Sequence, residues 1–377
     1  MTSISALKQP TWKTEIPLVI GAISGGAAIL GHGPAAASAG PGSILWSLWI
    51  VVCLVVCAVR AMAHADRLAE RYGEPVGTIV LTIAAITIEV ASVCAMMLGD
   101  GGSDTAARDS MFAVIMLILN GLVGGCMVVG TWRTGEQRFN PDSASAYLPL
   151  IIALGTLTMV LPRFCDSTIG GYMSDPMEIF VAATSIVVYG GFLWLQVSRY
   201  RGYFATPATP GDKAAHHAGT VHVPSAVLLL LASLGVVVLC ADAMAGRVPS
   251  LLRASGSPPA IGGVLVAAMV LFPEGLAAIK ASARGDMQRS INVLLGSAGA
   301  TIGLTVPAVL VVRALTGKDP ELGLEPPYIV LLSLTFLVSA VHLARGRVNM
   351  IQGIIHLLIM LAWVMTIYDD ALPSELP

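Results

Sequence analysis

Charged residues are scarce in this sequence. Asp, Glu, Lys and Arg make up 12% of its 377 residues, and hydrophobic residues make up 55%. A soluble domain carries about 25% charged residues. Deep within the long apolar stretches, Lys and Arg are missing altogether. This scarcity excludes an ordinary soluble domain and indicates a polytopic helical membrane protein.

Several other absences narrow the class further. The alternating strands of about ten residues that build a membrane barrel are missing, because the apolar runs are continuous. No His-Glu-x-x-His motif occurs, which argues against an intramembrane metalloenzyme. The first ten residues, "MTSISALKQP", lack the apolar core of a signal peptide, so we expect the first helix to be retained. The cysteines have no metal-ligand spacing with a histidine and are interpreted as packing residues: Cys53, Cys57, Cys94, Cys126, Cys165 and Cys240.

The long apolar stretches predict about eleven membrane-spanning helices, since a helix needs about 20 apolar residues to cross a bilayer. The predicted spans are 16–32, 43–60, 76–98, 110–131, 145–161, 178–198, 223–244, 260–280, 290–312, 327–344 and 350–368. The segment before the first span and the loops after even-numbered spans hold 15 of the 21 Lys and Arg. This bias predicts a cytoplasmic N-terminus. With an odd number of spans, the C-terminus lies outside the bacterial inner membrane.

The longest predicted internal loop, 199–222, divides the chain into two parts. It is rich in Pro, Gly and Ala and carries His216, His217 and His222. No Cys or acidic cluster completes a metal shell there, so we interpret it as a linker. The expected organisation is an N-terminal segment with the first helix (1–42), a first half (43–198), the cytoplasmic linker and a second half (223–377).

The two halves contain a repeated pattern. "GTIVLTIAAITIEVASV" from Gly77 and "GGVLVAAMVLFPEGLAAI" from Gly262 each place a glutamate, Glu89 or Glu274, twelve residues after the glycine. The predicted topology gives the two units opposite directions across the membrane. Inverted repeats with polar residues near the midplane are typical of secondary transporters. The expected fold is therefore all-α, with one N-terminal helix plus two inverted five-helix repeats.

Glu89 and Glu274 are the two acidic residues deep within well-defined spans. A charge at the bilayer centre costs about 3 kcal/mol or more, so it is retained where it faces a cavity, pairs or titrates. Because a bound cation favours the ionised carboxylate, protons and cations compete for the same oxygens. Two carboxylates suit one calcium ion or two protons, and sodium or potassium with one retained proton balances equally well. The pair therefore predicts a cation/proton exchange site.

A calcium ion takes six to eight oxygens, more than two carboxylates supply. Candidate supporting side chains lie on the same predicted spans or on the spans that follow them: Thr82, Ser92, Asn120, Ser297 and Thr301. Pro273 removes a backbone donor beside Glu274 and would free carbonyls near Met269 and Val270. Membrane hydroxyls also bond to their own helix backbone, and a proline also simply kinks a helix, so each of these roles has a structural alternative.

Three segments resemble a known family. "GEPVGTIVLTIAAITIEV", "ARDSMFAVIMLILNGLVG" and "FPEGLAAIKASARGDMQRSINVLLGSAGATIGLTVPAV" are similar to the two alpha-repeats of the calcium:cation antiporter superfamily, in particular its bacterial cation/proton antiporter branch. The resemblance implies a ten-helix exchanger core plus one extra N-terminal helix. It also implies that Glu89 and Glu274 bind cation and proton in turn, and that Asn120, Ser297 and Thr301 complete the site.

The sequence thus predicts an inner-membrane antiporter that exchanges a cytoplasmic cation, calcium first, for protons. The better-known calcium/proton members carry Gly-Asn shortly before each glutamate, where this chain has "AITIE" and "LFPE". Sodium or potassium therefore stays open as the cargo, and a cation channel is the alternative from another class. We expect lipid, cations and protons as partners, with no resident cofactor and no nucleic acid. Homo-oligomer formation is left open.

Overall fold

The structure is a computed structural model that describes residues 14–31, 41–72, 104–132, 134–165, 170–204, 223–245, 247–248, 251–252 and 261–370, with the single residues Ile86, Val90 and Val93. The elements before residue 205 are α1 (Ile16–Ile29), α2 (Pro41–Tyr72), α4 (Ala106–Met116), η2 (Leu117–Leu122), α5 (Val123–Thr131), β1 (Glu136–Arg138), α6 (Pro141–Gly155), η3 (Thr156–Val160), η4 (Leu161–Phe164), α7 (Asp175–Val197) and α8 (Arg201–Phe204). Those after it are α9 (Val223–Ala245), α11 (Ile261–Val270), α12 (Phe272–Ala283), α13 (Met287–Thr316), α14 (Pro326–Leu343), β2 (Arg347–Asn349) and α15 (Met350–Asp370).

Helices coincide with every predicted span except the third, which lies almost wholly outside the described residues. Eight of the described helices are long and apolar enough to cross a membrane, which confirms an all-α polytopic fold. Large apolar side chains such as Val187, Val330 and Ile351 are about two-thirds exposed or more on the outside of the bundle. Such side chains are stable there when lipid, rather than water, surrounds the helices. The total of eleven spans stays a prediction.

The second predicted span differs from the structure in length. The sequence predicts 43–60, whereas α2 continues to Tyr72. The apolar stretch does end where Arg60, His64 and Arg67 begin. The helix continues because Ala, Leu, Arg and Glu, which dominate the following turns, are strong helix formers. Hydropathy therefore marks where lipid contact ends, and it does not mark the end of the helix.

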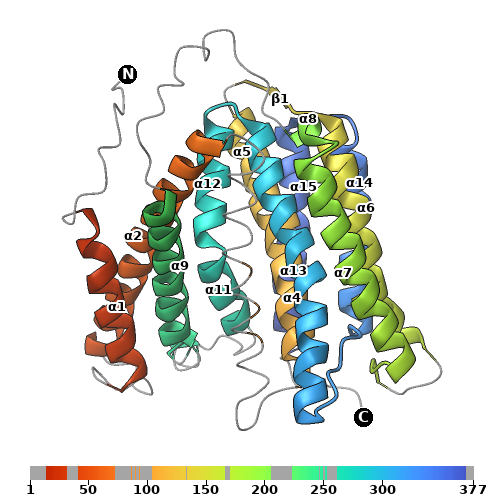
Figure 1. Cartoon of the computed structure of the whole chain (residues 1–377), viewed down its shortest axis with the longest axis horizontal. Helices are drawn as coiled ribbons and strands as arrows, with labels where there is room; N and C mark the ends of the chain where they lie inside the picture. The colour runs from red at the N-terminus through yellow and green to blue at the C-terminus, as the bar shows by residue number, and fades with distance from the viewer. Residues whose placement is uncertain are drawn as a thin grey trace.

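The helices form two groups with the broken helix α11–α12 between them (Figure 1). In one group α9 packs against both α1 and α2, around a core that includes Ile50, Leu54, Val237 and Cys240. The larger group contains α4 to α7 and α13 to α15 around a second, more extensive core. α11 packs on α9 of the first group and on α4 of the second, and α12 packs on α2 of the first group and on α13 and α5 of the second. Helices from the two predicted halves of the chain are mixed in both groups.

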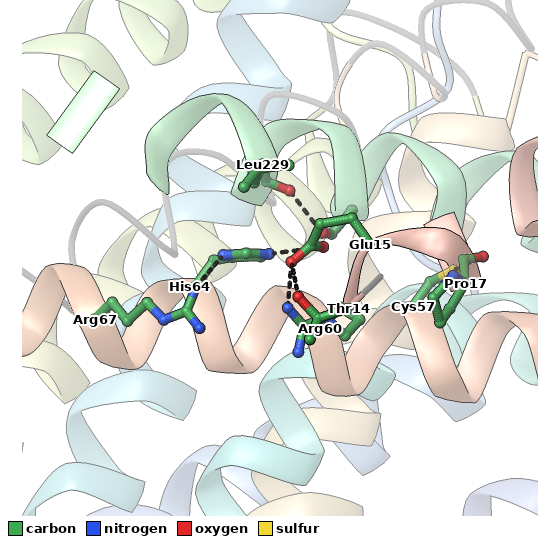
Figure 2. Close-up of polar contacts among 9 residues, drawn as sticks. Thr14, Glu15, Pro17, Cys57, Arg60, His64, Arg67 and Leu229 are labelled. Atoms are coloured by element: carbon green, nitrogen blue, oxygen red, sulfur yellow. Dashed lines mark hydrogen bonds and ion pairs between the residues drawn. The ribbon is translucent and has the colours of Figure 1, made fainter. Parts of the chain in front are cut away.

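A polar cluster joins the start of α1 to α2 (Figure 2). Glu15, which precedes α1, forms an ion pair with Arg60, and its other oxygen lies 3.3 Å from Nε2 of His64. The His64 ring in turn lies 3.4 Å from the Arg67 guanidinium. Burial of Glu15 opposes its ionisation, but the hydrogen bond and positive charge of Arg60 outweigh that effect, so the pKa of Glu15 is lowered. The cluster fixes α1 onto α2.

Loss of this carboxylate should make stability less dependent on pH. Because the pKa of Glu15 is depressed in the folded chain, its contribution is present at neutral pH and is lost as the pH falls through that pKa. We expect Glu15→Gln to destabilise the protein by about 1 kcal/mol at neutral pH. In detergent, the thermal unfolding midpoint of Glu15→Gln should be lower than that of the wild type at neutral pH. In acid the two midpoints should be nearly equal. An equal difference between the midpoints of variant and wild type at both pH values would contradict this role. Glu136→Gln, at an exposed position, is the control.

Two distant loops meet at one end of the bundle through a short β pair. β1 and β2 are antiparallel, with Gln137 opposite Val348. The side-chain amide of Gln137 also donates to the carbonyl oxygens of Gly130 (2.6 Å) and Ser282 (3.0 Å). The loops that carry β1 and β2 both belong to the set predicted to be cytoplasmic, so their meeting is consistent with one shared face. α8, at the start of the predicted linker, lies at the same end (Figure 1).

Ion pairs tie the loops at the opposite end. The Arg313 guanidinium contacts the carboxylates of Asp175 (2.8 Å), Asp319 (2.6 Å) and Glu178. At the same end of the bundle, Arg108 bonds to Asp109 and to Glu321, each at 2.9 Å. The acidic side chains at this end are therefore largely engaged in connecting α4, α7 and α13 to the loops beside them.

Candidate cation-binding site

The helix that carries Glu274 is interrupted beside it. α11 ends at Val270 and α12 begins at Phe272, which places Pro273 in the first turn of the new helix. A proline is favourable in that position because the first N–H groups of a helix have no partner within it. Backbone bonds continue across the interruption, from Leu271 to Ala267 and from Gly275 to Leu271. The break is therefore a local kink, and Pro273 has no N–H to donate to the Met269 carbonyl.

Glu274 lies in the first turn of α12 and is 2% exposed. The Ser297 hydroxyl donates a 2.6 Å hydrogen bond to Oε2 of its carboxylate. The other oxygen, Oε1, is buried and has no hydrogen-bond partner among the described residues. The positive end of the α12 dipole favours a negative charge at this position. One carboxylate oxygen is thus held in place while the second is available to a cation or a proton.

α13 presents a line of hydroxyls on the same side as Ser297. Thr301 and Thr305 follow it at four-residue intervals, and all three are buried. This spacing places them on one face of the helix. The Thr305 hydroxyl has no hydrogen-bond partner within the described chain. The line of hydroxyls begins at Ser297, which contacts Glu274, and continues along α13 to Thr305. Hydroxyl oxygens are among the ligands that hard cations bind.

Asn120 lies in η2, a π-helical segment between α4 and α5. Such segments are often found at functional sites, because the wider turn redirects a side chain. η2 also contacts the helix of Glu274: a Cβ added to Gly275 would lie 2.8 Å from the Leu122 side chain. The Asn120 amide donates to Thr335 (2.9 Å), and its oxygen lies 3.3 Å from Nδ1 of His356. In this conformation the carboxamide is bonded to α14 and α15 rather than to Glu274.

Three residues of the predicted site lie outside the described residues. This applies to Glu89, Thr82 and Ser92. The three histidines of the predicted linker are outside them as well. Within the described ranges, no group of three or more His, Cys, Asp or Glu is arranged to hold a metal ion. Pairing of Glu274 with Glu89 across the repeats therefore stays a prediction.

Sequence reasoning did not identify the residues around Asn120. Thr335 on α14 and His356 on α15 bond directly to its amide, and His342 stacks edge-on against His356 with ring centroids 5.3 Å apart. Asn120 and His356 are 236 positions apart. The one signal available in the sequence is that His342 and His356 each stand within an apolar span.

A bundle of membrane-crossing helices, with a buried carboxylate beside a break in one of them, has the architecture of a secondary transporter. Comparison with known proteins agrees with this class. Residues 42–198 and 225–368 match the family described as sodium/calcium exchanger protein. The chain therefore belongs to the sodium/calcium exchanger family, which confirms the resemblance seen in the repeats.

Two bacterial relatives and one crystal structure illustrate the similarity. The putative ionic transporter y4hA of Sinorhizobium fredii is 37% identical over 282 residues, 74% of this chain and 77% of that protein. The sodium-potassium/proton antiporter ChaA of Escherichia coli is 30% identical over 299 residues, 77% of this chain and 80% of that protein. The crystal structure of the H+/Ca2+ exchanger CAX has a TM-score of 0.65 at 13% identity, covering 97% of this chain and 90% of its own. The likeness to CAX shows the fold alone.

Proposed function

We propose that this chain is a secondary antiporter that exchanges a cytoplasmic cation for protons across the bacterial inner membrane. The observation that carries this proposal is the state of Glu274. Its carboxylate is 2% exposed, one oxygen accepts a hydrogen bond from Ser297, and the other has no partner among the described residues. A buried carboxylate with one free oxygen is stable in the membrane when a cation or a proton occupies that oxygen.

Competition for this oxygen gives the exchange. With a cation bound, the carboxylate is ionised and its charge is compensated by the ion. With a proton bound, the group is neutral and no cation is held. The core of the carrier reorients when the carboxylate binds a cation or a proton, and it does not reorient when the carboxylate is empty and charged. This restriction couples the cation flux to the proton flux. Ser297 keeps the carboxylate in one orientation during the exchange, and Glu89 is the expected second exchange group.

Calcium is the cargo that we propose first, because two carboxylates neutralise one divalent ion or two protons. Sodium or potassium is the second candidate. The observation that favours it is the 30% identity to a protein named as a sodium-potassium/proton antiporter. The predicted orientation, with the N-terminus in the cytoplasm, is supported by the basic loops and by the β1–β2 pair that joins two of them.

Transport into inverted membrane vesicles tests this function. Respiration acidifies the vesicle interior and quenches a pH-sensitive dye, and addition of a transported cation should restore the fluorescence as protons leave. We expect calcium to restore it most strongly, with sodium and potassium compared over a range of pH. No recovery with any of the three ions would overturn the proposal. Cation uptake that continues without a proton gradient and without proton movement would identify a channel instead.

A further inference from the structure

A buried polar network extends from Asn120 toward the end of the bundle that carries β1 and β2. Asn120, Thr335 and His356 are all 0% exposed and are linked by the two hydrogen bonds of the Asn120 amide. The Thr335 hydroxyl donates to the Leu331 carbonyl at 2.7 Å, so it accepts from the Asn120 amide. The amide orientation is therefore fixed: nitrogen toward Thr335 and oxygen toward His356. Figure 1 shows α14 and α15, which supply these partners, at the side of the bundle away from α1.

A close helix crossing places His356 in this network. α5 and α15 meet at two glycines: a Cβ on Gly124 would lie 2.9 Å from the Cβ of His356, and one on Gly353 would lie 2.7 Å from the Gly124 carbonyl oxygen. Side chains at either glycine would force the helices apart. Close packing of the two backbones thus places the Cβ of His356 directly beside Gly124.

The hydrogen-bond partners of His356 define its tautomer. Its Nδ1 faces the Asn120 side-chain oxygen, with the backbone of Leu119 as a second hydrogen-bond partner of the ring. A carbonyl oxygen accepts and does not donate, so Nδ1 carries the hydrogen. Nε2 is then a lone pair, fully buried and without a hydrogen-bond partner in the described part of the chain. In this structure the ring is therefore a neutral imidazole, and Nε2 is the atom at which it can take up a proton, against the opposing effect of burial.

His342 provides a connection from this nitrogen toward the surface. It is half-buried in the last turn of α14, just before β2, and its ring is in edge-on contact with the ring of His356. Its own Nδ1 is also buried and lacks a partner among the residues described. Two imidazoles in edge-on contact, each with an unpartnered nitrogen, thus lie between the end of the bundle that carries the β pair and Asn120. An imidazole in water exchanges protons in the pH range of about 5 to 8, and burial moves this exchange toward lower pH.

Among the described residues, the other titratable or charged side chains near α15 do not share this contact. α15 packs against α4, α5, η2, α14 and β2. These elements and α15 itself carry, besides the two histidines, Arg108, Asp109, Cys126, Tyr328, Arg347, Tyr368, Asp369 and Asp370. Arg108 is paired with Asp109, and Tyr328 with Asp370. Arg347 is exposed, 3.9 Å from Glu136. His342 is the one of this set in ring contact with His356.

We propose that His356 is a proton-accepting positioning residue of the cation site: it orients Asn120, and a proton on its Nε2, delivered through His342, weakens cation binding. The inference rests on the proposed function, in which Asn120 supports the bound cation. A neutral His356 holds the Asn120 oxygen through Nδ1. A protonated His356 keeps that bond and adds a positive charge in a low-dielectric interior, where it repels a cation strongly. The proton is bound and released at one atom, and no covalent step is involved.

Two substitutions separate positioning from proton binding. His356→Gln keeps an N–H to donate to Asn120 and cannot be protonated, whereas His356→Leu removes both functions. The slope of log KM for the cation against pH, measured in proteoliposomes, gives the number of protons that compete with the cation. In His356→Gln this number should fall by about one. At alkaline pH, where His356 is neutral in the wild type, KM should be near the wild-type value. His356→Leu should raise KM about tenfold at every pH, because it leaves the Asn120 oxygen unsatisfied. His342→Gln should keep the wild-type slope and lower the rate.

The matched control is Met360→Leu, one turn further along α15 and facing η2 beside Gly121. It changes packing without a titratable group, and its slope should equal that of the wild type. An unchanged slope in His356→Gln, or identical behaviour of the Gln and Leu variants, would overturn the proposal. A wild-type rate in His342→Gln would overturn the proton route.

A second measurement distinguishes this inference from the proposed function. Calorimetric titration of the purified protein with calcium or sodium, in buffers of different ionisation enthalpy, counts the protons released on binding. His356→Gln should release up to one proton fewer than the wild type. If the wild type releases more protons on cation binding than His356→Gln but no vesicle transport occurs, the proposed function is wrong and the proton site stands. If the wild type and His356→Gln release the same number of protons, the proton site is wrong whatever the transport result.

Discussion

Glu274→Gln should reduce cation/proton exchange on the order of 100-fold, because it removes a charge-assisted cation ligand from a buried site. Glutamine has nearly the same shape and still accepts the Ser297 hydrogen bond, so the fold is preserved. It has no charge to balance a cation and takes up no proton in the operating range. The same vesicle assay measures the loss, with protein abundance in the membrane checked by immunoblot.

Glu178→Gln is the matched control, because Glu178 is also buried, at 4% exposure. It pairs with Arg313, which keeps its contacts with Asp175 and Asp319 when Glu178 is neutralised. Exchange in this variant should stay within about twofold of the wild type. Wild-type exchange of calcium, sodium and potassium by the Glu274→Gln protein would show that Glu274 is not the exchange group.

Gly353→Ala should destabilise the protein by about 3 kcal/mol, near the upper end of the usual cost of overpacking. A Cβ at this position would lie 2.7 Å from the Gly124 carbonyl oxygen and within 2.9 Å of side-chain atoms of Met127 and Val128. The nearest of these atoms belongs to the backbone, so a rotamer change does not relieve the contact. α5 and α15 must separate, which also lengthens the bond between His356 and Asn120.

Gly125→Ala is the control for this effect, since a Cβ at Gly125 would meet nothing within 4 Å. In a helix interior, alanine is favoured over glycine by about 1 kcal/mol. The two substitutions should therefore move the thermal unfolding midpoint of the detergent-solubilised protein in opposite directions. Equal midpoints for the two variants would show that the crossing at Gly353 is not tightly packed.

The sequence predicts the membrane helices well because lipid imposes a simple requirement. A helix that crosses a bilayer must be continuously apolar over about 20 residues, and spans such as 327–344 and 350–368 satisfy this without ambiguity. The break beside Glu274 was also predictable, since Pro273 cannot continue a helix in the usual way. Local chemistry determines both features, so each is visible in a short stretch of sequence.

The surroundings of Asn120 were not predictable, because they depend on contacts between distant parts of the chain. The sequence suggests that Asn120 serves the cation site, but it does not show that Thr335 and His356 already occupy its amide. That arrangement requires the π-helical turn of η2 and the glycine crossing of α5 with α15. Neither has a local pattern that distinguishes it from an ordinary helix contact. The contribution of Glu89 to the site stays a prediction.

The β1–β2 pair has a mechanical consequence for transport. It fastens the loop between α5 and α6 to the loop between α14 and α15, and thereby links the two halves of the chain. At the same end, the Ser282 hydroxyl donates to the Cys126 carbonyl at 2.5 Å, which attaches the end of α12 to α5. α11, the other part of the broken helix, packs against α9. These contacts join the two halves of the chain at this end, so we expect α5, α12 and α15 to move together there during transport.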